Sequence, residues 1–127
     1  MPDKHLYEYA VIRVVPRVER EEFINVGVVL FCKQQKYLKA LFSLNADKLK
    51  SISPESDVAT IQPYLDAFVA ISNGKSPCGP IGQLDPASRF RWLTATRSSI
   101  IQTSKVHPGF SNDLDKTLER LHEQLVM

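Results

Sequence analysis

The chain has 127 residues, of which 43% are hydrophobic and 24% are charged. This balance is typical of a soluble globular protein and excludes a disordered or fibrous one. A domain of this size buries roughly two thirds of its unfolded surface, so it can hold a core without disulfides or metals. The net charge of +2 is too small to indicate nucleic-acid binding by itself. We expect one domain over residues 1–127.

The two cysteines, Cys32 and Cys78, are too few for a disulfide framework, and no Cys–His spacing resembles a zinc site. Cys32 closes an apolar run and is expected to be a buried thiol, whereas Cys78 is expected to be exposed. Glu8 and Arg13 interrupt the apolar N-terminal stretch, which is therefore neither a signal peptide nor a membrane span. The sequence predicts a bacterial cytoplasmic protein without a cofactor or metal.

Two runs of β-branched and aromatic residues near the N-terminus predict two strands that flank a charged connection. The first, 6–16, has apolar residues on both alternating faces, as in a central strand covered on both sides. Residues 16–23 are too many for a tight turn and are expected to hold a helical turn. In the second strand, 24–32, Gly27 indicates a bulge or the close approach of another group. A third strand, 37–43, completes an antiparallel meander.

The hydrophobic period then changes to that of helices. Asn45 is expected to cap a short helix that runs through Ile52. Pro63 decides where the next, longer helix begins. A cap at Asp57 would place this proline in the helix interior at a cost of ~3 kcal/mol, so we predict a cap at Thr60. The apolar stripe of this helix consists of Ile61, Leu65, Phe68 and Val69.

An Asn-Gly pair at 73–74 is expected to end the long helix in the left-handed conformation. Residues 74–84 are rich in Gly and Pro and predict a loop. Asp85 is followed by a proline, the pattern of a cap and a first helical residue. A short helix is therefore predicted to run through about Leu93.

The C-terminal part of the chain predicts one more strand and one more helix. Residues 99–103 are short and β-branched and predict a fourth strand, and residues 106–109 predict a turn. Ser111 or Asn112 then caps the last helix. We therefore expect an α+β fold, in which three to four helices pack on an antiparallel sheet of three to four strands, meander first. The apolar stripe of the last helix consists of Leu114, Leu118, Leu121 and Leu125.

Acidic residues are absent from the 27 residues between Asp85 and Asp113. Arginine offers a fork of donors that matches carboxylate or phosphate, and hydroxyl groups can complete an anion pocket. The alternative is that these arginines pair with acids elsewhere in the chain, such as Glu8, Glu19, Glu21 and Glu22. The segment contains Arg89, Arg91, Trp92, Arg97, Ser98, Ser99, Gln102, Ser104, Lys105 and His107.

Two polar residues stand out in the predicted strands. Arg13 on an apolar strand face costs on the order of several kcal/mol unless it is paired. We expect a glutamate of the 19–22 connection as its partner; the alternative is that the face opens onto a pocket. Asn25 either bonds a turn backbone or shares that pocket. The candidate ligand-binding residues are Arg13, Asn25, Arg89, Arg97, Ser98 and His107.

The catalytic motifs that can be read from sequence are absent. There is no glycine-rich phosphate loop, no GxSxG elbow and no paired-histidine metal motif. No general base that could activate Ser98 or Ser99 is recognisable in the sequence. His107 could titrate near neutrality, but a lone histidine in a turn is more commonly structural than catalytic. We therefore predict no catalytic residues.

Several strings of the chain resemble a small bacterial family that is catalogued as a domain of unknown function, number 3037. The family usually has a histidine before the tryptophan and a proline before Arg97, where this chain has Arg91 and Thr96. The resemblance implies no activity. It implies a partner, because genes of the family often lie beside a gene for a kinase-like protein similar to HipA toxins. The strings are YEYAVIRVVP (7–16), Glu19, EF (22–23), NVGVVLFC (25–32), GPIG (79–82), RFRWLTA (89–95), RS (97–98) and VHPG (106–109).

The sequence is compatible with two functions. It does not determine the oligomeric state. The favoured function is that of a non-enzymatic module that binds a protein partner such as the HipA-like kinase, since no nucleophile, base or metal set is recognisable. It predicts an exposed apolar patch. The alternative is a domain or enzyme that binds an anionic small molecule, such as a nucleotide or phosphate, in a pocket where the candidate residues converge. A nucleic-acid partner is disfavoured. Roughly four nearby cations could contact only a few phosphates, and at ~0.9 log units of salt dependence per phosphate they would give only modest affinity.

Overall fold

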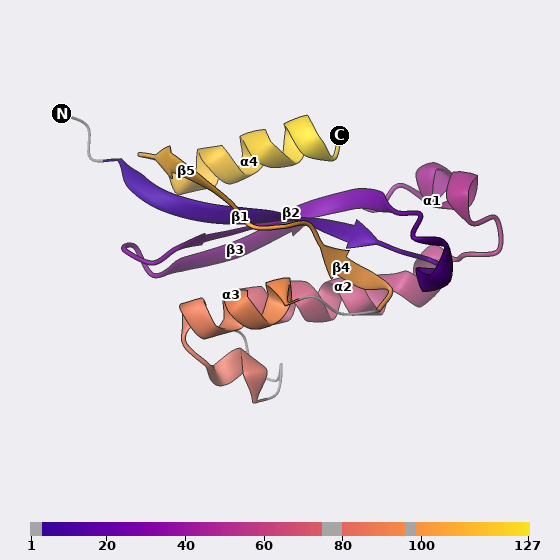
Figure 1. The fold of residues 1–127 in the computed structure, drawn as a ribbon, viewed down its shortest axis with the longest axis horizontal. Coiled ribbons are helices and arrows are strands. Elements are labelled where there is room, and N and C mark those ends of the chain that lie inside the picture. The colour runs from indigo at the N-terminus through magenta and orange to yellow at the C-terminus, as the bar shows by residue number, and fades with distance from the viewer. Residues whose placement is uncertain (1–3, 75–79, 96–98) are drawn as a thin grey trace.

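The structure is a computed structural model that describes residues 4–74, 80–95 and 99–127. It is an α+β fold with an antiparallel sheet, as predicted, in the order β3-β2-β1-β4, and β5 also pairs with β1 (Figure 1). The strands are β1 His5–Val14, β2 Ile24–Cys32, β3 Tyr37–Phe42, β4 Ile101–Thr103 and β5 His107–Ser111. The α-helices are α1 Ala46–Ile52, α2 Val58–Asn73, α3 Pro86–Thr94 and α4 Leu114–Leu125, and two short 3₁₀ helices are η1 Val18–Arg20 and η2 Ile81–Gln83.

The central strand is β1, as its two apolar faces predicted. On one side it pairs with β2, and on the other with β5 along its first half and with β4 along its second half. Helices α2 and α3 cover one face of the sheet and α4 covers the other (Figure 1). Ile12 of β1 belongs to the core on the α2 side, and Tyr7 belongs to the core on the α4 side. Within the described residues, no helix has the length and apolar character needed to cross a membrane.

Gly27 shows both of the properties that its position in a strand predicted. The pairing of β1 with β2 shifts register between Ile12 and Arg13, so that Ile12 faces Gly27 and Arg13 faces Asn25. A Cβ atom on Gly27 would overlap the carbonyl oxygen of Leu41 and lie 2.9 Å from a Phe42 atom. The neighbouring strand β3 therefore leaves room for no side chain here, and the bulge places Arg13 and Asn25 opposite each other.

Most of the predicted helix signals are confirmed. The side chain of Asn45 accepts hydrogen bonds from the first turn of α1, and that of Asp85 accepts one from Ser88 N in α3. Gly74 ends α2 with a φ of 65°. The predicted helical turn in the 16–23 connection is η1. Cys32 is fully buried, as predicted, whereas Cys78 lies outside the described residues.

The predicted start of α2 at Thr60 is wrong. Asp57 caps the helix by accepting from Ala59 N at 2.9 Å, and Pro63 lies inside the helix. The earlier start adds Val58 to the core against the sheet. Ala59 and Pro63 are both exposed, so water can satisfy the carbonyl that the proline leaves without a donor.

The predicted turn at 106–109 is also wrong, because His107–Ser111 forms β5. This strand pairs with the first half of β1, and the sheet has one strand more than we expected. Pro108 lies in an edge strand, where a missing amide is tolerated. Gly109 lies against the ring of Tyr7, which leaves no space for a Cβ atom.

The predicted cap of α4 is off by one or two residues, since Asp113 is the cap and accepts from Lys116 N at 3.1 Å. Ser111 instead accepts from Asp113 N at 3.0 Å and bonds the Thr117 hydroxyl at 2.5 Å. The predicted leucine stripe of α4 faces the sheet and forms most of the helix side of the second core.

Candidate functional site

An apolar groove of about 380 Å³ lies on the α2 side of the sheet. We call it the α2–α3 groove. Tyr64, Phe68 and Ile71 recur at three-to-four spacing along α2, which places them on one face of that helix. Helix α3 supplies Trp92 from its last turns. The groove is lined by Tyr64, Ala67, Phe68, Ile71, Trp92, Leu93, Ser99, Ile100 and Ile101.

Two aromatic side chains of this groove are partly exposed. Tyr64 has 55% of its surface exposed and Trp92 has 38%. The described residues of the lining include no carboxylate, histidine or lysine, and the Ser99 hydroxyl donates to the carbonyl of Ile101 at 2.6 Å. The groove therefore has the composition of a binding surface for apolar groups and offers no acid–base pair among the described residues.

A second cavity, of about 440 Å³, lies beside the C-terminal end of α4, and we call it the polar cavity. Asn25 Nδ2 donates to the Leu125 carbonyl at 3.2 Å, and Lys48 Nζ donates to the Val126 carbonyl at 3.1 Å. These contacts place donors on the last carbonyls of α4, where a helix is unsatisfied. The cavity is lined by Ile24, Asn25, Ser43, Leu44, Asn45, Lys48, Val126 and Met127.

Three buried polar atoms in this region have no hydrogen-bond partner among the residues that the structure describes: Arg13 Nε, Asn25 Oδ1 and His122 Nδ1. The other ring nitrogen of His122 bonds the Ser43 hydroxyl at 3.0 Å. Burial lowers the pKa of His122, because a buried imidazolium loses its hydration. Burial therefore favours the neutral form of the His122 ring.

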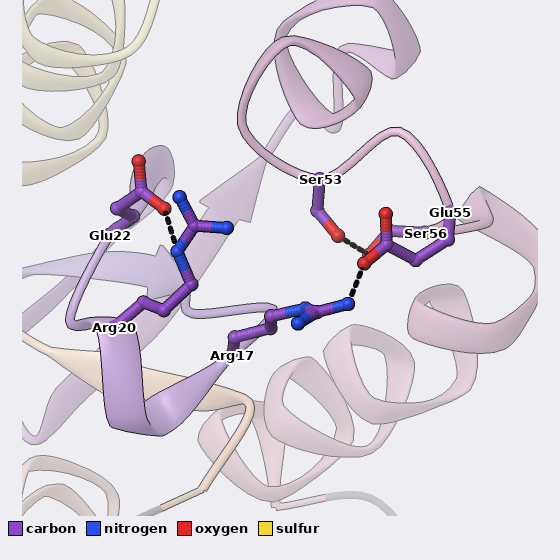
Figure 2. A network of polar contacts seen from close by, with 6 residues as sticks. All are labelled: Arg17, Arg20, Glu22, Ser53, Glu55 and Ser56. Carbon is purple, nitrogen blue, oxygen red and sulfur yellow. Dashed lines mark hydrogen bonds and ion pairs between the residues drawn. The ribbon is translucent and has the colours of Figure 1, made fainter.

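Arg13 does not pair with a glutamate of the 19–22 connection, so that prediction is wrong. Its guanidinium carbon lies 4.1 Å from the centre of the Phe23 ring, a cation–π contact. Within the described residues no carboxylate forms an ion pair with it. Glu22 is engaged by Arg20 at 2.8 Å, as Figure 2 shows.

Figure 2 also shows Arg17, which pairs with Glu55 in the loop between α1 and α2. This contact ties the charged connection before β2 to the loop. Both of its side chains are about half exposed, so its contribution to stability is small. The arginines of the connection are thus engaged by acids, and Arg13 in the adjacent strand is not.

Arg89 caps the C-terminal end of α2. It is 9% exposed, and its Nε donates to the Leu84 carbonyl at 2.9 Å. Its Nη1 donates to the carbonyls of Ile71 and Ser72, both at 2.9 Å. The positive group satisfies carbonyls at the end of α2, as basic side chains commonly do at helix C-termini.

The structure brings two of the predicted site residues together and separates others. Arg13 and Asn25 face each other across β1 and β2, and Arg89 belongs to the helix layer on the α2 side. His107 is exposed at the start of β5, with its ring 5.4 Å from that of Tyr9. Tyr9 and Arg13 are four positions apart along β1, which is about 13 Å at ~3.3 Å per residue. Arg97 and Ser98 lie outside the described residues.

Sequence reasoning did not select Tyr64, Lys48 or His122 as site residues. Tyr64 has a weak signal, because it lies off the core stripe of α2 and an aromatic residue there must be exposed or bound. Lys48 and His122 have no such sequence signal, since their position depends on where α4 ends against α1 and β3. Trp92 was recognised only as a neighbour of the arginines.

The structure is a small α+β fold with partly exposed aromatic side chains at an apolar groove, and its described part contains no recognisable catalytic set. The family described as protein of unknown function, DUF3037, matches residues 9–126. The chain belongs to this family, as the resemblance indicated. Comparisons with curated proteins and with solved structures gave no match.

Proposed function

We propose that this chain is a bacterial cytoplasmic protein-binding module that holds an apolar segment of a partner in the α2–α3 groove. The observation that carries the proposal is the exposure of Tyr64 and Trp92 at an apolar groove. Tyrosine and tryptophan are enriched among the residues that contribute most binding energy at interfaces. An apolar groove between helices also suits partner side chains that are themselves apolar.

The partner that we propose is the HipA-like kinase. What supports it is the frequent position of family genes beside the gene for such a kinase. A module and a kinase that are produced together can form a stable complex without the module having an activity of its own.

The test is complex formation between the purified chain and the kinase encoded beside it, followed by isothermal titration calorimetry. We expect Trp92→Ser and Tyr64→Ser each to weaken binding about tenfold or more, since each removes an aromatic anchor. Phe110→Ser is the matched control, because Phe110 is 68% exposed and does not line the groove. Circular dichroism confirms that each variant is folded. Groove variants that bind like the wild type would contradict the proposal.

A second candidate function is the binding of an anionic small molecule near Arg13. What favours it is that this partly buried guanidinium has no carboxylate partner within the described residues and faces Asn25 at the polar cavity. The test is a thermal-shift measurement with inorganic phosphate and with adenosine monophosphate. A rise in melting temperature that Arg13→Met abolishes would favour this function. The same melting temperature with and without either compound would count against it.

A further inference from the structure

Another cavity, of about 450 Å³, lies beside the N-terminal end of α3, and we call it the charged cavity. One wall comes from the start of β1 and the end of β2, and the other comes from α3 and its cap. The volume is within the range of small-molecule sites. The described residues that line the cavity are Leu6, Glu8, Phe31, Lys33, Asp85, Ala87 and Arg91.

The apolar part of this lining is fixed by packing. Phe31 is 6% exposed, and its ring stacks on that of Phe90 with 5.1 Å between the ring centres. Ala87 lies one helical turn before Phe90 and packs against the same core. Leu6 is 51% exposed and adds apolar surface from β1. The cavity therefore offers an apolar surface to a bound molecule.

Each wall of the charged cavity also carries one acid and one base. Glu8 and Lys33 belong to the strand wall, and Asp85 and Arg91 belong to the helix wall. Each of these groups has a group of opposite sign on the other wall. No ion pair nevertheless joins any two of them in the described part of the chain. The cavity thus holds charges of both signs that are not paired with each other.

These charges differ in how far they are already engaged. Asp85 is the cap of α3 and accepts from Ser88 N at 3.3 Å. Hydrogen bonds with Ser88 lower the pKa of Asp85, and the charge of Arg91 contributes. Arg91 uses only Nη2, on the Ser88 hydroxyl at 3.3 Å, so the rest of its fork is open. Among the described residues, the Glu8 carboxylate has no hydrogen-bond or ion-pair partner.

The two walls therefore favour ligand groups of opposite charge. The helix wall combines the guanidinium of Arg91 with the N-terminus of α3, and both stabilise a carboxylate. On the strand wall the Glu8 carboxylate attracts an ammonium group. A simple anion fits less well, because Glu8 and Asp85 repel it. A molecule that carries both a carboxylate and an ammonium group matches both walls.

We propose that the charged cavity binds a free α-amino acid with an apolar side chain. The ligand carboxylate pairs with Arg91, its ammonium group pairs with Glu8, and its side chain lies against Phe31 and Leu6. An α-amino acid is the smallest common molecule that carries these three groups together. The site is independent of the proposed function, because the α2–α3 groove is lined from α3 by Trp92 and Leu93 instead.

The experiment titrates the whole chain with L-leucine, L-methionine and L-phenylalanine and follows the amide NMR spectrum. We expect the largest shifts at the lining residues Leu6, Lys33 and Ala87. Two analogues of phenylalanine each lack one charge: 2-phenylethylamine has no carboxylate, and 3-phenylpropionate has no ammonium group. Each analogue should bind about tenfold or more weakly than L-phenylalanine, because it loses one charge-assisted contact.

Two substitutions assign the two ends of the ligand. Arg91→Met should weaken binding of L-phenylalanine about tenfold and leave binding of 2-phenylethylamine unchanged. Glu8→Gln should also weaken binding of L-phenylalanine about tenfold, but it should not weaken binding of 3-phenylpropionate. Arg120→Met and Glu123→Gln are the matched controls, because they remove the same groups from exposed positions of α4 on the other face of the sheet. Both controls should bind L-phenylalanine within about twofold of the wild type.

Several results would overturn the proposal. Spectra that none of the three amino acids changes, or shifts that fall outside the lining, exclude the cavity as their site. Analogues that bind as tightly as L-phenylalanine show that the two charges are not read. The same holds if Arg91→Met and Glu8→Gln bind the amino acid like the wild type. If no amino acid binds and Arg91→Met weakens the complex with the kinase, the cavity belongs to the protein interface instead. Binding at the α2–α3 groove is tested separately by Trp92→Ser.

Discussion

Arg89 lies against Gly74 and closes the C-terminal end of α2. A Cβ atom on Gly74 would be 2.7 Å from Nη1 of Arg89. The guanidinium can therefore lie against this left-handed residue only because glycine has no side chain. The arginine donates to carbonyls on both sides of the loop that follows α2. It therefore joins α2 to the start of α3.

Replacing this arginine should destabilise the protein. We expect Arg89→Met to lower the free energy of unfolding by about 2–4 kcal/mol, because three buried or part-buried carbonyls lose charge-assisted hydrogen bonds. Urea denaturation followed by circular dichroism measures the change. Arg89→Lys keeps the charge but loses the fork of donors, so its free energy of unfolding should lie between those of the wild type and Arg89→Met. A loss of less than about 0.5 kcal/mol for Arg89→Met would show that the cap is unimportant.

The bulge in β2 gives a second prediction. Gly27→Ala places a Cβ atom onto the Leu41 carbonyl oxygen, and backbone cannot move aside as a flexible side chain can. We expect a loss of about 2 kcal/mol or more in the free energy of unfolding. The measurement is again urea denaturation, and the amide NMR spectrum shows whether β3 shifts. Wild-type stability with an unchanged spectrum would mean that this contact is not close in solution.

The Tyr37 hydroxyl donates to the Asp115 carboxylate at 2.6 Å and joins β3 to α4. This bond is the first cause that lowers the pKa of Asp115, and Lys39 at 3.5 Å also contributes. Folding therefore favours the ionised carboxylate. The stabilisation is present above the unfolded pKa of about 3.9 and is lost as the pH falls through the lower folded pKa.

Tyr37→Phe tests this linkage, because phenylalanine keeps the ring and removes the hydroxyl. We expect a loss of about 1 kcal/mol or less at neutral pH, since Asp115 is exposed to solvent. The difference between variant and wild type should shrink as the pH falls from about 5 to 2. The measurement is the urea midpoint of both proteins across this pH range. A difference that does not depend on pH would mean that the ring contributes and the hydrogen bond does not.

His122 should make stability fall on the acid side of neutrality. Its pKa is lowered by burial, so the unfolded chain binds the proton first as the pH falls through about 6.5. We expect the free energy of unfolding to decrease between about pH 7.5 and pH 5.5, and His122→Gln to reduce that decrease. His107→Gln is the control, since His107 is exposed. Parallel pH profiles for wild type and His122→Gln would contradict the prediction.

The meander and most helix boundaries could be predicted because their signals are local. Asn45 and Asp85 cap helices through bonds that reach only two or three residues along the chain. The start of α2 could not be predicted in this way. The burial of Val58 against the sheet outweighs the hydrogen bond lost at Pro63, and that burial depends on tertiary packing.

The candidate sites were harder to predict than the fold. β5 was taken for a turn because Pro108 and Gly109 favour turns, while its pairing partner lies at the opposite end of the chain. Arg13 was expected to need a carboxylate, but the ring of Phe23 takes that place. The α2–α3 groove is assembled from α2, α3 and the start of β4, so no single stretch of sequence carries its pattern.

The way in which β1 is paired has a consequence for the order of folding. Its partner β2 follows directly in the chain, whereas Ser104, which bonds Val11, is 93 residues away in sequence. Contacts of long sequence separation form slowly, because a large loop must close first. During synthesis the hairpin of β1 and β2 is complete while the other side of β1 still lacks its strands. Until residues 101–111 leave the ribosome, the nascent chain exposes an open strand that is vulnerable to aggregation.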